Sequence, residues 1–145
     1  MSNKVALAAL LSLMTCGVLV MQATADEPSK SQWDGVYSKE QAHRGETLYS
    51  ENCLMCHGAD LLGGEMAPPL IGGTFQSNWN ELTLGDLFER IRVSMPLTAP
   101  GSLSRQQYAD ILSYMLAKDN FPAGKSDLPT QTESLKEIKF LSTKP

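Results

Sequence analysis

The sequence predicts an all-α fold with three main helices and long loops. Three segments begin at a Ser or Thr that can cap a helix, and each then carries apolar residues at helical spacing. The stretch from residue 58 to 82 is rich in Gly and Pro and shows no strand alternation. A connection of that length is unusual in a compact domain unless it wraps around something. We therefore expect the loops to enclose a bound group.

The first helix is expected from about Lys39 to Asn52, with Ser38 as N-cap and Gln41 as its capping-box partner. Its inner face would carry Gly45, Leu48 and Tyr49.

The second helix is expected to start after Thr83 and to end near Ser94, because Pro96 disfavours helical backbone at Met95. Its buried stripe would be Leu84, Leu87, Phe88 and Ile91.

The third helix is expected between the N-cap Ser104 and Lys118, whose charge suits the negative end of the helix dipole. Its apolar stripe would be Tyr108, Ile111, Leu112, Met115 and Leu116.

The first 25 residues have the pattern of a cleaved secretory signal peptide. Lys4 precedes an apolar run from Val5 to Met21, and Ala23 and Ala25 are small residues suited to a cleavage site. We expect residues 26–37 to be a flexible leader and residues 38–120 to form the domain. Residues 121–145 would be a C-terminal extension that packs on the domain or trails from it. The expected location is the periplasm.

Composition excludes several classes of protein. The 145 residues are 42% hydrophobic, include three cysteines and carry a formal net charge of −4. A multidomain enzyme, a polytopic membrane protein and a disulfide-dense scaffold do not fit these values. Proteins that bind nucleic acids are usually strongly basic, whereas this chain is acidic, so no nucleic-acid partner is expected.

The pentad Cys53-Leu54-Met55-Cys56-His57 follows the first helix directly. This spacing is typical of c-type haem attachment. Two thiols three residues apart can each form a thioether with one vinyl group of the porphyrin. The adjacent imidazole of His57 then lies under the iron as an axial ligand. The sequence thus predicts one covalent haem c.

Three other interpretations of the two cysteines remain. A redox disulfide normally comes with a βαβ context, which this chain lacks. A zinc site needs four ligands, and only His43 and His57 could complete it. The third is a plain structural disulfide.

The sixth position of a haem iron is usually taken by a Met thioether or a second His. Met95 is the best candidate, because it leaves the second helix in extended conformation ahead of Pro96. Met66, in the Gly- and Pro-rich stretch, is a weaker one. Met115 is best explained by core packing and His43 by an exposed helix position, and Met55 lies within the attachment turn itself.

These features resemble a class I (monohaem) cytochrome c. The resemblance rests on Gly45 and Tyr49, the pentad, Pro68 with Leu70, Met95-Pro96, and Tyr114 on the last helix, and covers residues 38–118. It implies a class I cytochrome c fold in which Gly45 packs against Tyr114. It also implies a backbone carbonyl near Pro68 that holds the free nitrogen of His57. Leu70, Phe75 and Trp79 would line the haem pocket.

The stretch from Met95 to Leu141 is similar to cytochrome c domains that accompany quinoprotein (pyrroloquinoline quinone) dehydrogenases.

The expected function is one-electron transfer, without catalysis by the chain itself. The electron donor would be a periplasmic dehydrogenase, and the acceptor would be an oxidase or another cytochrome. We expect the chain to be a monomer that contacts the membrane only through its partners. One alternative is a haem subunit of a larger oxidoreductase complex. Another is a ligand-binding or peroxidase-like haem protein with a labile sixth site, which would need a distal base; His43 is the only spare histidine.

Overall fold

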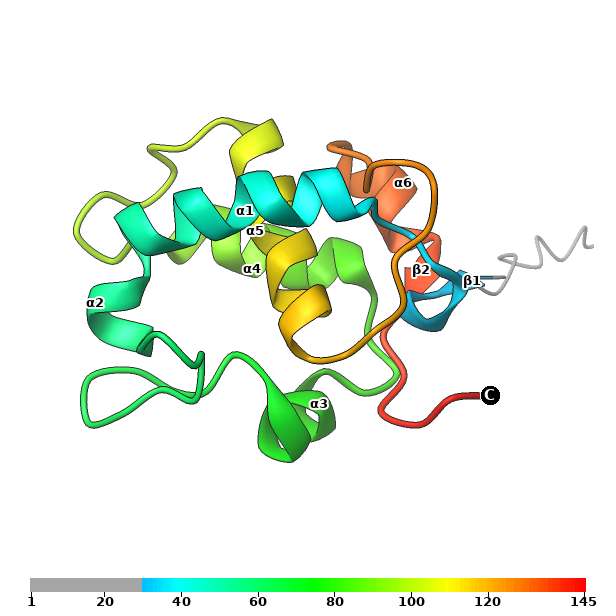
Figure 1. The fold of residues 1–145 in the computed structure, drawn as a ribbon, viewed down its shortest axis with the longest axis horizontal. Coiled ribbons are helices and arrows are strands. Elements are labelled where there is room, and N and C mark those ends of the chain that lie inside the picture. Colours follow the sequence, from blue (N-terminus) through cyan, green and yellow to red (C-terminus); the bar gives the residue numbers. More distant parts are fainter. Residues whose placement is uncertain (1–29) are drawn as a thin grey trace, which may run out of the picture.

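The computed structural model describes residues 30–145 (Figure 1). The expected signal peptide and residues 26–29 of the expected leader lie outside the described residues. The elements in chain order are β1 (Lys30–Ser31), the 3-10 helix η1 (Gln32–Asp34), α1 (Lys39–Asn52), α2 (Leu54–His57), α3 (Gly72–Trp79), α4 (Leu84–Ser94), α5 (Arg105–Lys118), α6 (Thr132–Lys136) and β2 (Ile138–Lys139).

The three predicted main helices are α1, α4 and α5, and all three have the predicted bounds. In each, the N-cap hydroxyl of Ser38, Thr83 or Ser104 accepts the backbone N–H three residues further on. The prediction of an all-α fold is therefore confirmed. Among residues 30–145, no helix is long and apolar enough to span a bilayer.

Helices α1 and α5 cross in close contact near Gly45 (Figure 1). A Cβ atom added at Gly45 would lie 1.9 Å from the carbonyl oxygen of Asp110 and 2.9 Å from Cβ of Tyr114. One turn on, the rings of Tyr49 and Tyr114 pack with centroids 5.4 Å apart. The expected contact between Gly45 and Tyr114 is thus present, and it sets how closely the two helices approach.

Helix α3 was not predicted, because the stretch 58–82 was expected to be irregular throughout. Its N-cap residue Ile71 provides no side-chain cap. The cap comes instead from Asp119 beyond the end of α5, whose Oδ1 accepts the backbone N–H of Gly72 at 2.8 Å. Because this partner is 47 residues away in the sequence, no local signal marks the start of α3.

Residues 30–37 differ from the expected flexible leader, because they are packed against the C-terminal segment. Gln32 is fully buried, and its side-chain amide forms hydrogen bonds of 2.6 and 3.0 Å with the backbone oxygen and nitrogen of Leu141. Strand β1 pairs with β2 in parallel, with Lys30 opposite Ile138. The stabilising partners are again distant in sequence.

Residues 121–145 pack on the domain and contribute to its core. Leu128, Leu135, Ile138 and Phe140 are buried together with the apolar stripes of α4 and α5. Gln41 of α1 bonds the backbone of Leu128 through both its amide atoms. Arg44 connects Asp110 of α5 with Asp127, at 3.1 and 2.6 Å.

Glu89 of α4 connects three helices. Its carboxylate contacts Arg92 at 2.6 Å and Arg105 of α5 at 3.4 Å, and it accepts the hydroxyl hydrogen of Thr132 on α6. The hydrogen bonds from Arg92 and Thr132 lower the pKa of Glu89 from 4.5 to about 2. This carboxylate is therefore ionised in the folded protein at pH values where it would be protonated in the unfolded chain.

A lowered pKa in the folded state stabilises the protein above the unfolded value, and this contribution is lost as pH falls. We therefore expect Glu89→Gln to lower the thermal midpoint at pH 7, with the gap to the wild type closing between pH 4.5 and about 2. Thermal unfolding followed by circular dichroism at a series of pH values measures the midpoints of the two proteins. The control Glu133→Gln removes an exposed carboxylate and should leave the pH profile unchanged. A gap for Glu89→Gln that is constant with pH would contradict the expectation.

Candidate functional site

Cys53 lies between α1 and α2, and Cys56 belongs to the single turn of α2. Figure 1 shows α2 directly after the end of α1. Cys53 closes α1, with its backbone N–H bonded to the carbonyl of Tyr49 at 2.8 Å, and the N–H of His57 bonds back to the carbonyl of Cys53 at 3.0 Å. Both thiols are free, with Cys53 half-buried and Cys56 exposed. Burial, helped by the neighbouring Cys56, raises the pKa of the Cys53 thiol to about 11. Neither thiol is used by a disulfide within the described residues.

His57 is buried, and a hydrogen bond to the backbone orients its ring. Its Nδ1 lies 3.0 Å from the carbonyl oxygen of Pro68. Because a carbonyl oxygen can only accept, Nδ1 is the donor, and in the neutral imidazole the lone pair is then on Nε2. Nε2 has no partner among residues 30–145. This is the contact that the resemblance implied for the Pro68 region, and it leaves Nε2 available to bind a metal.

The loop that carries Pro68 is held by its own backbone. The N–H of Gly63 bonds the carbonyl of His57 at 3.0 Å, and the N–H of Leu70 bonds that of Leu61 at 2.8 Å. Gly63 has a φ of +72°, and an added Cβ would lie 2.5 Å from the carbonyl oxygen of Ala67. Only glycine fits there. The hydroxyl of Tyr49 also donates to the carbonyl of Gly58 at 2.6 Å, which ties the start of the loop to α1.

Met95 caps the C-terminus of α4 in the extended conformation expected before a proline, with φ −125° and ψ 155°. Its backbone N–H bonds the carbonyl of Ile91 at 2.8 Å. Its own carbonyl accepts the hydroxyl hydrogen of Tyr108 at 2.7 Å. Tyr108 comes from α5 and is almost fully buried. The sequence predicts Tyr108 only as a residue of the buried stripe. Its hydrogen bond to the backbone of Met95 is not indicated by any sequence pattern.

The other candidate ligands have different environments. Met115 is buried in the core, as expected. Met66 and Met55 are 81% and 91% exposed. His43 is an exposed residue of α1, and its Nδ1 lies 3.5 Å from Glu46.

Leu70, Phe75 and Trp79 belong to the core or pack against it. The ring of Phe75 contacts Trp79, with centroids 6.3 Å apart, and Phe140, with centroids 5.9 Å apart. These contacts attach α3 to the C-terminal segment. Whether the three residues also line a haem pocket stays a prediction.

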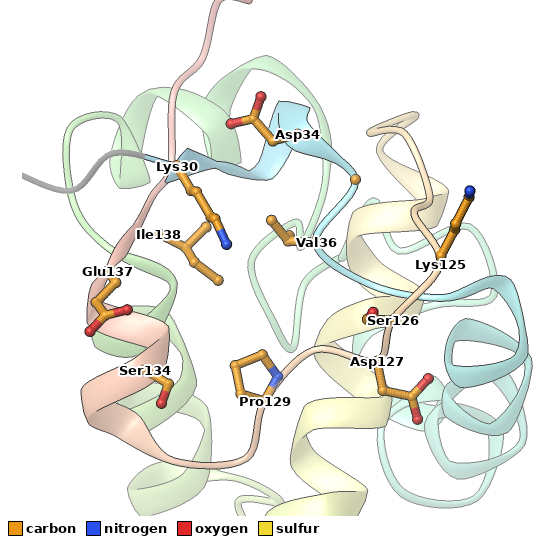
Figure 2. Close-up of a pocket in the computed structure, with 11 residues that line it drawn as sticks. Lys30, Asp34, Val36, Lys125, Ser126, Asp127, Pro129, Ser134, Glu137 and Ile138 are labelled. Atoms are coloured by element: carbon orange, nitrogen blue, oxygen red, sulfur yellow. The ribbon is translucent and has the colours of Figure 1, made fainter.

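Two cavities lie away from the pentad. One of about 380 Å³ lies between residues 30–36 and the C-terminal segment. Figure 2 shows the Lys30 side chain extending between Val36 and Ile138, with Pro129 on the opposite side. The other, of about 470 Å³, lies between α1 and α5 and includes Tyr37, His43 and Tyr114.

Residues 30–145 contain no group of three or more His, Cys, Asp or Glu side chains that could hold a metal ion. The zinc interpretation therefore has no support in the described part of the chain.

A family model decides between the remaining interpretations. The model described as cytochrome c oxidase, cbb3-type, subunit III matches residues 40–115, which include all but the first residue of α1, the pentad, α4 and Met95. The chain belongs to this family. No curated protein and no solved structure matches the chain.

This cytochrome c domain therefore binds a covalent c-type haem and takes part in electron transfer with redox partners. The predicted class I cytochrome c fold and the haem c cofactor are confirmed at the level of the family. The pentad fits the cofactor on its own geometry, since two free thiols share one turn with an imidazole whose Nε2 is available. The similarity to domains that accompany quinoprotein dehydrogenases is not part of what the family match shows.

Proposed function

We propose that the chain is a periplasmic one-electron carrier in which Cys53 and Cys56 hold the haem, and His57 and Met95 are the axial ligands. When bound, haem iron supplies a one-electron couple. The observation that supports the proposal is the hydrogen bond between His57 Nδ1 and the Pro68 carbonyl, which leaves Nε2 available to serve as a ligand. Both axial positions would then be filled by protein atoms, which leaves no position for substrate.

Met95 is favoured over Met66 because its backbone is fixed. The phenol of Tyr108 holds the Met95 carbonyl, whereas Met66 is an exposed side chain on the loop. A thioether ligand on the side opposite an imidazole raises the reduction potential relative to a second histidine. Tyr108 would thus act as a positioning residue for the ligand.

The ligation is tested by Met95→Ala, with Met66→Ala as the control for loss of an exposed methionine. We expect Met95→Ala to abolish the near-infrared charge-transfer band between sulfur and ferric iron, and to let carbon monoxide bind the reduced protein rapidly at neutral pH. Met66→Ala should retain the band and exclude carbon monoxide. An unchanged spectrum in Met95→Ala would refute the assignment. Rapid carbon monoxide binding by the wild type would favour the ligand-binding alternative.

We further propose that the electrons come from a periplasmic dehydrogenase, with a quinoprotein as the first candidate, and go to an oxidase or another cytochrome. The similarity of residues 95–141 to the cytochrome domains of such systems supports the donor. It is an argument from analogy and not from the chemistry of the site.

The second candidate function is a haem subunit of a larger oxidoreductase complex. The family favours it, because its description names an oxidase subunit. Purification from the native membrane and soluble fractions distinguishes the two. A carrier is recovered as a free monomer, whereas a subunit is recovered at fixed stoichiometry with its complex.

A further inference from the structure

The charges of the chain are divided unevenly along the sequence. From Gly45 to Glu89 there are seven carboxylates and neither Lys nor Arg. From Arg90 to Lys144 there are eight basic and five acidic side chains. The net charge of −4 is therefore concentrated in the segment that contains the pentad and its loop.

The fold turns this division into a difference between two ends of the molecule. The C-terminal end of α1, helix α2 and the loop after it lie at the left of Figure 1, whereas β1, β2, α6 and the C-terminus lie at the right. Of the seven carboxylates, Glu51, Asp60 and Glu65 belong to the segments at the pentad end. Glu81 and Glu89 instead contact Lys139 and Thr132 of the C-terminal segment, at the other end. Six lysines belong to other segments, namely β1, the start of α1, the end of α5, the loop after α5, α6 and β2. They are Lys30, Lys39, Lys118, Lys125, Lys136 and Lys139.

Two of the carboxylates at the pentad end have no partner in the described part of the chain. Glu51 in the last turn of α1 and Glu65 in the loop are exposed and form no hydrogen bond or ion pair. Asp60 is also exposed, and its Oδ1 accepts the backbone N–H of Leu62 at 3.1 Å. Of the cations that follow on α4, Arg92 is paired with Glu89, and Arg90 is exposed.

Exposed apolar side chains lie in the same segments as these carboxylates. Met55 of α2 is 91% exposed, and Leu62 and Met66 of the loop are 57% and 81% exposed. Large apolar side chains grouped on a surface and bordered by charge are typical of a protein-binding site. Residues 93–104, which lead from α4 to α5 through Met95, carry no charged side chain, and among them Leu97 is 75% exposed.

We propose that the pentad end docks a redox protein whose own docking surface has an apolar centre bordered by Lys and Arg. The proposal rests on the carrier function proposed above and specifies the partner. Met55, Leu62 and Met66 form the apolar contact, while Glu51, Asp60 and Glu65 attract the basic border and speed the encounter. A transient electron-transfer complex needs only a small interface, and these six residues can form the middle of one.

The test uses the reduced holoprotein and stopped-flow absorbance, with two oxidised blue-copper proteins of opposite net charge as probes. The variant Glu51→Lys/Glu65→Lys reverses the two unpaired charges at the pentad end. The control Glu133→Lys/Glu137→Lys makes the same change of charge on exposed residues in the first turn and at the C-cap of α6. Rates are measured from low ionic strength to about 0.5 M salt, where the Debye length falls below about 5 Å.

At low salt we expect the basic probe to oxidise the wild type at least about tenfold faster than it does Glu51→Lys/Glu65→Lys. The control should stay within about twofold of the wild type, and the three rates should converge at high salt. The acidic probe should show the opposite ranking. Equal rates for the two variants, or a wild-type rate with the basic probe that does not depend on salt, would overturn the docking proposal.

Oxidation by hexacyanoferrate(III) at high salt separates this failure from a failure of the carrier function. If all three proteins are oxidised rapidly there, the haem exchanges electrons and only the docking proposal is under test. If none is oxidised, the carrier function itself is wrong.

Discussion

Replacing Gly45 with alanine should destabilise the protein by about 3 kcal/mol, although alanine is the better helix former. The added methyl group would lie 1.9 Å from the carbonyl oxygen of Asp110, which is backbone and cannot rotate away. Helices α1 and α5 would have to separate along their whole contact. Because Cys53 follows directly at the end of α1, the separation would also move the haem attachment turn.

The matched control is Gly73→Ala, which makes the same substitution in α3, where nothing lies within 4 Å of the added Cβ. It should stabilise the protein by about 0.5–1 kcal/mol through helix propensity. Chemical unfolding of both holoproteins, followed by far-ultraviolet circular dichroism, gives the free energies. Equal stability of the two variants would show that the crossing is looser than described.

Phe140→Ala should cost about 3–5 kcal/mol, as for other large-to-small substitutions at buried aromatic residues. The ring is fully buried and packs edge-to-face on Phe75 and Phe121, with centroids 5.9 and 5.4 Å apart. Through Phe75 it supports α3, and α3 follows the loop that presents the Pro68 carbonyl to His57. The C-terminal segment is therefore expected to unfold together with the cytochrome domain in one transition.

The neighbouring Leu141→Ala serves as control, because its backbone, and not its half-exposed side chain, bonds Gln32 and Trp33. It should cost less than about 1 kcal/mol. Thermal unfolding of both variants, followed at a haem band and by circular dichroism, measures the effect. If Phe140→Ala unfolded at the wild-type temperature, or in two separate transitions, the segment would be an appendage and not part of the core.

The sequence predicted those elements whose signals are local. Helices α1, α4 and α5 each have a capping side chain and an apolar stripe within a few turns, so their bounds could be read directly. Helix α3 and residues 30–37 could not be predicted, because Asp119 and Leu141 stabilise them from far along the chain.

The candidate site divides in the same way. The pentad is a contiguous motif, and the Pro68 carbonyl was expected only because the chain resembles a known family. The bond from Tyr108 to the Met95 carbonyl had no sequence signal, since it depends on the path of the loop between α4 and α5. The uneven division of charge can be read from the sequence, but only the fold shows that α2 and its loop lie at the end of the molecule opposite β1, β2 and α6 (Figure 1).

A reduced pyridine haemochrome spectrum of the purified holoprotein tests directly whether Cys53 and Cys56 hold a haem. We expect the spectrum of haem with both vinyl groups saturated by thioethers, at one haem per chain, and no haem extracted by acidified acetone. Cys53→Ser/Cys56→Ser should lose this covalent haem. A wild-type protein without haem, or with haem that acidified acetone removes, would show that the pentad does not bind haem covalently.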